Sequence, residues 1–157
     1  MPTIKLITLI NAPIERCYNL ARSIDLHVKS MATSGEKAIA GRVTGLINLN
    51  ETVTWKAKHF SIPFTLTSKI SEMEYPFSFT DEMTEGPFQH FHHQHLFKTL
   101  ASKTEMIDIF DFKAPLGLFG SIAERCFLKS YMTSLLEKRN QIIKQTAEQQ
   151  ETPANLF

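Results

Sequence analysis

Residues 88–113 read FQHFHHQHLFKTLASKTEMIDIFDFK, and most of this stretch alternates in a pattern typical of two β-strands. Four of the six histidines of the chain lie in its first half. Because a strand sends alternate side chains to opposite faces, His93 and His95 share one face with neighbouring phenylalanines. His90 and His92 take the other face, where we expect them to be solvated.

The register of these strands predicts which carboxylates face the histidines. With a loop at 100–103, the two strands place His95 opposite Asp108. Pairing Glu82 with His92 across the turn at 85–87 places Asp81 opposite His93, and a slip of two residues in this pairing stays open. Opposed side chains have Cβ atoms about 4.5–5.5 Å apart, so we predict two carboxylate–imidazole pairs, Asp81–His93 and Asp108–His95.

The remaining sequence predicts more strands and two short helices before one long helix. Ser23 is the expected cap of the second helix, and proline suits the first helical position of the first. The expected strands, besides 88–99 and 104–113, are 3–10, 37–40, 51–59, 62–73 and 77–84, and the short helices are 13–22 and 24–28.

The long C-terminal helix carries a broad apolar stripe at spacings of three and four residues, which must pack on a sheet. The stripe consists of Leu128, Tyr131, Met132, Leu135, Leu136, Ile142 and Ile143. About six strands followed by such a helix predict an α+β fold in which a curved sheet wraps the helix and leaves a pocket. We expect one domain over 1–145 and a polar, frayed tail over 146–157.

Composition narrows the function classes. The chain of 157 residues has a formal net charge of +1, which argues against bare nucleic acid as a partner. No apolar run approaches the ~18 residues of a membrane span, and the alternating N-terminus lacks a cleavage site, so we expect a cytoplasmic protein. Twelve phenylalanines against one tryptophan indicate a large apolar interior or a cavity wall. Cys17 and Cys126 are expected to be buried free thiols.

Four stretches carry a family resemblance: NAPIERCYNLARSIDLH, VTWKAKHF, FHHQHLF and DIFDFKAPLGLFG, at 11–27, 53–60, 91–97 and 108–120. With the element order, they resemble the START/Bet v 1-like (SRPBCC) superfamily, and look closest to an uncharacterised bacterial branch of it. The resemblance implies a helix-grip fold, with six to seven strands around the long helix. It does not imply one ligand, because the superfamily includes lipid carriers, hormone receptors, polyketide cyclases and ring-hydroxylase subunits. The iron ligands and Rieske cysteines of the hydroxylases are missing here.

We predict that the protein binds a hydrophobic or amphipathic small molecule, lipid-, isoprenoid- or polyketide-like, between the sheet and the long helix. We expect no cofactor and no metal, and a homodimer stays open. The predicted apolar walls are Trp55, Phe64, Leu66, Met83, Phe110, Phe112, Tyr131 and Leu135, with His59 near the mouth. The predicted polar groups are Asp81, His93, His95 and Asp108.

Other interpretations of the same residues stay open. The carboxylate–imidazole pairs could simply brace the interior, or two histidines and a carboxylate could hold a metal. The main rival function is an enzyme of the cyclase, dehydratase or hydrolase type with one histidine as general base. A protein-interaction module would need an exposed apolar patch. Arg139 could pair with a carboxylate or be a solvated helix charge, and His27 could lie at the pocket entrance.

Overall fold

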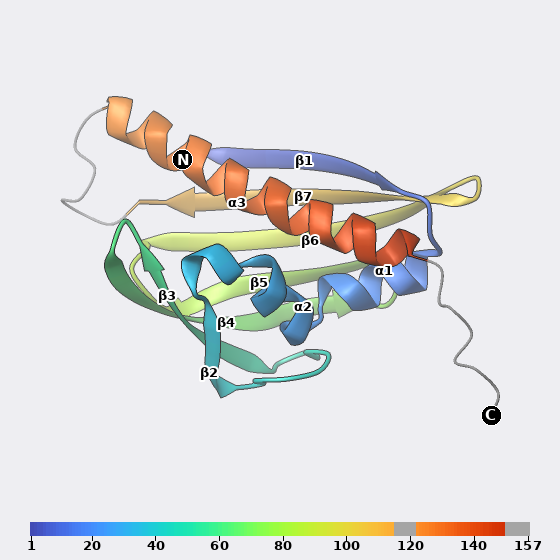
Figure 1. Cartoon of the computed structure of the whole chain (residues 1–157), viewed down its shortest axis with the longest axis horizontal. Coiled ribbons are helices and arrows are strands. Elements are labelled where there is room, and N and C mark those ends of the chain that lie inside the picture. Colours follow the sequence, from blue (N-terminus) through green and yellow to red (C-terminus); the bar gives the residue numbers. More distant parts are fainter. Residues whose placement is uncertain (115–121, 150–157) are drawn as a thin grey trace.

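The computed structural model describes residues 1–114 and 122–149 as one antiparallel sheet with helices on one side (Figure 1). The strands are β1 (Thr3–Ile10), β2 (Lys37–Gly41), β3 (Thr52–His59), β4 (Ile62–Glu74), β5 (Ser78–Glu85), β6 (His90–Leu100) and β7 (Lys103–Lys113). The helices are α1 (Ile14–Ala21), α2 (Ile24–Ser30) and α3 (Ile122–Glu148), with a 3₁₀ turn, η1, at Ala32–Ser34.

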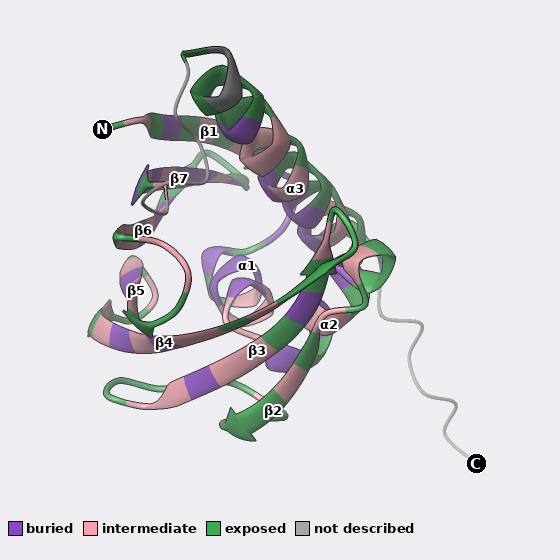
Figure 2. Ribbon diagram, turned by 90° about the vertical axis from the view of Figure 1, so that its left-hand side faces the viewer, coloured by how far each residue is buried: buried purple, intermediate pink, exposed green. Residues whose placement is uncertain are grey.

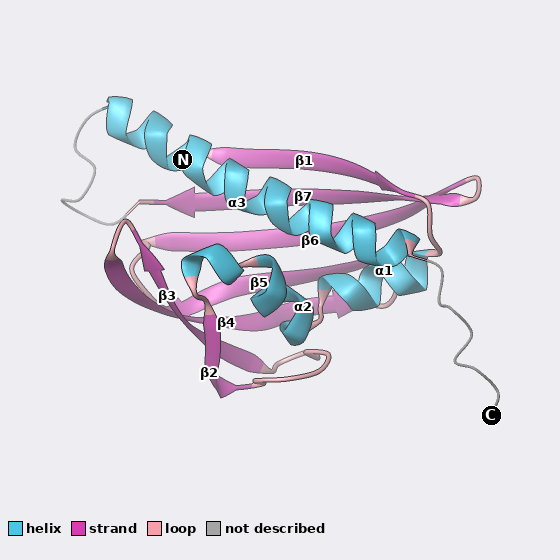
Figure 3. Ribbon diagram, viewed as in Figure 1, coloured by secondary structure: helices cyan, strands magenta, loops and turns pink. Residues whose placement is uncertain are grey.

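The strand order is β1-β7-β6-β5-β4-β3-β2, so the first strand pairs with the last. Strands β2 to β7 follow one another as hairpins, while α1 and α2 carry the chain from one edge of the sheet to the other (Figure 3). The link expected at 115–120 lies outside the described residues.

The sheet curls around an interior that α3 closes on the open side (Figure 2). Register shifts between β4 and β5, at Thr67/Ser68 and at Ile70/Glu72, contribute to this curvature because a bulge bends its strand. This architecture confirms the predicted helix-grip fold, with seven strands.

The predicted register of the histidine strand is confirmed on both sides. Strand β6 pairs with β7 so that His95 lies opposite Asp108, and with β5 so that His93 lies opposite Asp81. All four residues therefore share the concave face of the sheet, beneath α3. His90 and His92, on the other face, are half-buried.

Local signals explain where the short helices begin. Helix α1 starts directly after Pro13, and Glu15 lies in its first turn, where a carboxylate is favourable. The side chain of Ser23 accepts a hydrogen bond from the backbone N–H of Leu26, which caps α2 as expected.

Two expectations about α3 and its cysteine are wrong. The helix continues to Glu148, beyond the expected start of the tail at 146, because Arg16 of α1 donates to the carbonyl oxygens of Thr146 and Ala147. Ala147 is only 4% exposed. Cys126 is exposed, whereas Cys17 is buried as expected.

The apolar side chains form two clusters. One gathers Tyr18, Phe79, Phe97 and Ile143 where α1, the sheet and the end of α3 meet. The other joins Ile4, Phe110 and Phe112 to Leu128 and Leu136 of α3. A space that neither cluster fills remains between the sheet and α3.

Candidate functional site

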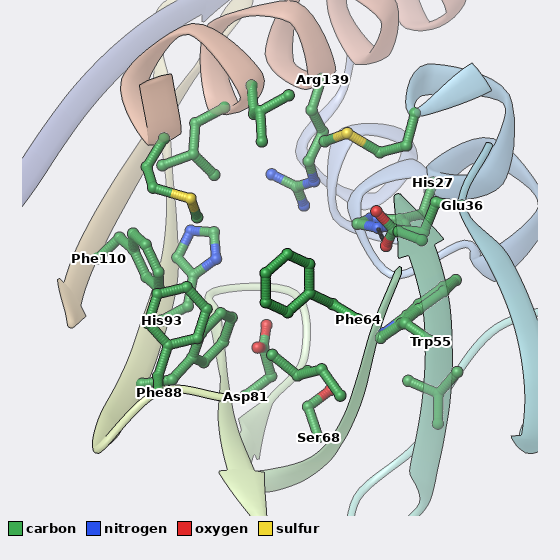
Figure 4. A pocket seen from close by; sticks show the side chains of 18 of the residues that line it. His27, Glu36, Trp55, Phe64, Ser68, Asp81, Phe88, His93, Phe110 and Arg139 are labelled. Atoms are coloured by element: carbon green, nitrogen blue, oxygen red, sulfur yellow. Dashed lines mark hydrogen bonds and ion pairs between the residues drawn. The ribbon is translucent and has the colours of Figure 1, made fainter. Parts of the chain in front are cut away.

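The interior holds a cavity of about 270 Å³ whose lining is mostly apolar (Figure 4). Small-molecule pockets in proteins are typically about 300–1,000 Å³, so this space suits a compact ligand. The predicted site residues that line it are Trp55, His59, Phe64, Leu66, Asp81, His93, His95, Phe110, Tyr131 and Leu135. Side chains from both the sheet and α3 face this common space.

Three predicted site residues do not line the cavity. Phe112 is 1% exposed and stacks on Phe110 within the second apolar cluster, so it supports the wall from behind. Met83 lines a small separate depression beside Lys69. Asp108 lies deeper, beneath the histidines.

Asp108 is the hub of a buried hydrogen-bond network. Its carboxylate is fully buried and accepts hydrogen bonds from His93 Nε2 (2.9 Å), Asn140 Nδ2 (2.6 Å) and Arg139 Nη1 (3.3 Å). Burial opposes its ionisation, but the hydrogen bond from His93, the close ring of His95 and the charge of Arg139 hold the pKa of Asp108 well below its usual range. It is therefore a carboxylate at neutral pH.

The histidine–carboxylate pairs are crossed relative to the prediction. His93 bonds to Asp108 rather than to Asp81, which lies opposite it, and His95 Nε2 lies 3.0 Å from Asp81 Oδ2. Each bond runs diagonally between neighbouring strands, a reach that long side chains have. The sequence thus predicted the right four residues and the right register. The predicted Asp108–His95 pair is in contact at 3.0 Å, but the hydrogen bonds of the two histidines run to the other carboxylate in each case.

His95 lies between the two carboxylates. Its Nδ1 is also 3.0 Å from Asp108 Oδ1, yet the angle does not allow a hydrogen bond, so Nδ1 has no hydrogen-bond partner among the described residues. The ring stacks on Phe79 with 4.2 Å between centroids and is 2% exposed. These contacts fix the ring position along the cavity wall.

Asp81 is the carboxylate that reaches the cavity. Its side chain is 19% exposed, and Oδ2 accepts from His95 while Oδ1 has no partner in the described part of the chain. Burial would raise the pKa of Asp81, but the hydrogen bond from His95 outweighs it, and this pKa is lowered. The cavity wall therefore presents one open carboxylate oxygen.

His93 is a neutral donor at neutral pH. Burial, followed by repulsion from His95, lowers the pKa of His93 to about 4, although Asp108 acts in the opposite direction. Since its Nε2 lies beside a carboxylate oxygen, the proton of the neutral ring is placed on Nε2. The ring packs at a tilt of 56° against Phe110, with 5.3 Å between centroids.

Arg139 and Asn140 complete the site. The sequence indicated a carboxylate partner for Arg139 only as one of two alternatives, and it did not indicate Asn140. Arg139 is 5% exposed, points from α3 into the interior (Figure 4), and also donates to the backbone oxygen of Ala21 at 3.1 Å. It is one of the cavity's lining residues and not a solvated charge. The sequence does contain a signal that these two residues face inward. Positions 139 and 140 follow Leu135 and Leu136 by four residues and thus continue the apolar stripe.

The mouth of the cavity carries its own polar pairs. His59 Nδ1 lies 2.7 Å from the Tyr131 hydroxyl, which bridges the β3–β4 hairpin and α3. Burial lowers the pKa of His59 and raises that of Tyr131, so both are neutral at pH 7. His27 packs on Trp55, 4.3 Å between centroids, and its Nε2 lies 2.7 Å from Glu36. His27 therefore belongs to the cavity wall.

The arrangement allows three kinds of chemistry. Ligating atoms of Asp81, His93 and His95 lie within 4.8 Å of one another, which is loose for a common metal ion and would require the existing hydrogen bonds to open. The Asp81–His95 pair has the form of an acid–base group. The apolar lining with one open carboxylate has the form of a small-molecule site.

Comparisons with known proteins agree on the fold. No protein-family model matches the sequence, and no curated protein does. Among solved structures, the chain is similar to the Zhui aromatase/cyclase from Streptomyces sp. R1128, with TM-score 0.78 and 12% identity over 99% of both chains. It is also similar to a START superfamily protein from Mycobacterium smegmatis, with TM-score 0.70 and 10% identity over 93% of this chain and 97% of that one.

A plant protein extends the comparison. The ginseng major latex-like protein 151 from Panax ginseng has TM-score 0.62 and 14% identity over 94% of this chain and 99% of its own. At such identities the likeness concerns the fold. Among the described residues, no helix combines the length and the apolar character that crossing a membrane requires.

Proposed function

With the helix-grip fold of START and Bet v 1-like structures as the premise, we propose that this protein binds a hydrophobic or amphipathic small molecule between its sheet and α3. The observation that carries the proposal is a cavity of about 270 Å³ with a mostly apolar lining and a polar strip formed by Asp81, His93, His95 and Arg139. Burial of apolar ligand surface contributes roughly 25 cal/mol per Å², so such a lining favours an apolar body.

The polar strip supports binding because it is rigid before any ligand arrives. Asp108 holds His93 and Arg139, and His95 holds Asp81, so the groups at the wall are already oriented. A ligand then loses less free energy to the ordering of side chains. Structural bracing and ligand orientation are thus two consequences of one network.

Native mass spectrometry of the purified protein, before and after denaturation, tests the proposal by detecting a co-purifying molecule. Trp55, the single tryptophan, lines the cavity, so its fluorescence should also change when an apolar ligand is titrated in. We expect saturable binding of at least one compact apolar compound. A protein that binds none, by either method, contradicts the proposal.

A pair of variants separates cavity binding from surface adsorption. Ala57 lines the cavity on β3, while its neighbour Lys56 is exposed on the other face. Ala57→Phe fills part of the space and should weaken binding at least tenfold, whereas Lys56→Phe should leave it unchanged. Equal affinities in the two variants would locate the ligand outside the cavity.

A second candidate function is an enzyme of the cyclase, dehydratase or hydrolase type. It is favoured by one observation: Asp81, hydrogen-bonded to His95, presents an open oxygen to the cavity and could accept a proton from a bound substrate. Turnover of a genuine substrate that is unchanged in His95→Gln would remove this candidate. Binding without turnover would leave the carrier function alone.

A further inference from the structure

The polar end of the cavity offers an unpartnered acceptor. Asp81 Oδ1 is the free oxygen of a carboxylate whose Oδ2 is already bonded to His95. The lowered pKa of Asp81 means that Oδ1 is an acceptor without a proton at neutral pH. A ligand group that meets it must donate a hydrogen bond or carry a positive charge.

The buried network around Asp81 has no net positive charge. With neutral imidazoles, the network of Asp81, Asp108 and Arg139 sums to −1, and a proton on His95 would bring it only to zero. The Arg139 guanidinium already lies 3.3 Å from Asp108. In either state, an anionic ligand group at this end would lose its hydration and face a carboxylate without compensation.

The other charged groups of the lining do not alter this balance. Arg22 is turned toward the loop at 47–48, where it donates to the Ile47 backbone oxygen and to the Asn48 side chain. Glu36 is held by His27. Among the described residues, the guanidinium groups of Arg22 and Arg139 both already donate to protein oxygens, so neither is an unpartnered site for a carboxylate ligand.

From these contacts we propose that the ligand is an apolar molecule with a hydroxyl or amine that donates to Asp81 Oδ1, and that the site rejects apolar carboxylates. This inference rests on the proposed function and specifies its ligand class. The site should therefore bind phenols, alcohols and amines more tightly than fatty acids and aromatic acids of the same size. A site built to hydrogen-bond a hydroxyl also rejects an analogue without it, because a buried polar group would be left unpaired.

Three probes with one ring system test the class. 2-Naphthol carries a donor, 2-methoxynaphthalene carries only an acceptor, and 2-naphthoate is anionic. Isothermal titration calorimetry at pH 7.5 should give the lowest Kd for 2-naphthol, with the other two at least about tenfold weaker. 2-Naphthoate that binds as tightly as 2-naphthol overturns the inference. Failure of all three to bind contradicts the proposed function instead.

A variant tests whether Asp81 causes the preference for 2-naphthol over 2-naphthoate. Asp81→Asn keeps the shape and can still face His95, but it removes the negative charge, so the preference for 2-naphthol over 2-naphthoate should fall at least about fivefold. The matched control is Glu82→Gln, the next residue of β5, which faces the other side toward His92. A preference that is equal in both variants would contradict the role of Asp81. If Asp81→Asn does not fold, the three probes on the unmodified protein still decide the ligand class.

Discussion

The two halves of α3 differ in how they are held. The C-terminal half is tied to the rest of the fold by Arg139 and Asn140, which bond to Asp108, and by Ile143, which is 2% exposed. The N-terminal half contains Ile122 and Phe127, which are 80% and 54% exposed. One continuous helix therefore has an anchored end and an open end.

The difference between the two halves indicates on which side a ligand would enter the cavity. The open half is attached through Leu128, which is 6% exposed in the second apolar cluster, through aromatic contacts such as Phe127 with Phe60 at 5.5 Å between ring centroids, and through the Tyr131–His59 hydrogen bond. Contacts at an exposed surface cost little free energy to break, whereas the buried network is expensive to open. A ligand would thus enter beside the N-terminal half while the C-terminal half keeps the sheet and helix together.

Asp108→Asn should lower the free energy of unfolding most, because Asp108 is the partner of Arg139 and Asn140 in the C-terminal half of α3. Removing this charge leaves Arg139 buried without its carboxylate, and breaking such a pair costs about 3–5 kcal/mol. Urea unfolding should show this loss in the free energy of unfolding. Asp111→Asn, on the opposite face of β7, is the control, and a loss no greater than that of the control would refute the anchoring role.

Truncation of an apolar side chain in each half of α3 should have the next largest effect on stability. Ile143→Ala creates a cavity in the packed cluster and should lower the free energy of unfolding by about 2–4 kcal/mol. Phe127→Ala removes an exposed ring and should cost less than about 1 kcal/mol, although the ring is larger. Thermal or urea unfolding of the two variants compares the halves directly, and equal losses would mean that α3 is held evenly along its length.

Acid should loosen the anchored half by a smaller amount. His93 has its pKa lowered from 6.5 to about 4, so the unfolded chain binds the proton more readily than the folded protein does. Its stabilising contribution is present above pH 6.5 and is lost as the pH falls toward 4. The expected loss from this residue between pH 7.5 and pH 5 is about 2 kcal/mol.

The pH experiment has an internal comparison. Replacement of His93 by Gln should flatten the fall in stability between pH 6.5 and pH 4, whereas His90→Gln, on the outer face of β6, should not. The lowered pKa values of Asp81 and Asp108 act with the same sign at still lower pH, since carboxylates with depressed pKa values destabilise the fold once they are protonated. Stability of the unmodified protein that is flat from pH 7.5 to pH 5 would show that His93 does not titrate as its burial demands.

Much of the fold could be predicted because alternation and turns are local signals. The loop after Leu100 determined which residues of β6 and β7 lie opposite each other, so His95 and Asp108 could be paired by position alone. The position of Met83 outside the cavity could not be predicted from alternation, because Met83 pairs with Ser68 in the same register in which Asp81 pairs with Ile70. Cys126 was expected to be buried because the sequence does not show where the helix leaves the core.

The sequence by itself determined the order of the strands and helices, the faces that alternate side chains occupy, and the four titratable residues on the concave face. The tertiary structure decided their partners, since the diagonal bonds His93–Asp108 and His95–Asp81 depend on rotamers and on the position of α3. It also decided that Arg139 enters the interior, because only the packed helix places a guanidinium beside Asp108. Strand periodicity is a property of the chain, whereas the balance of buried charges exists only after separate segments come together.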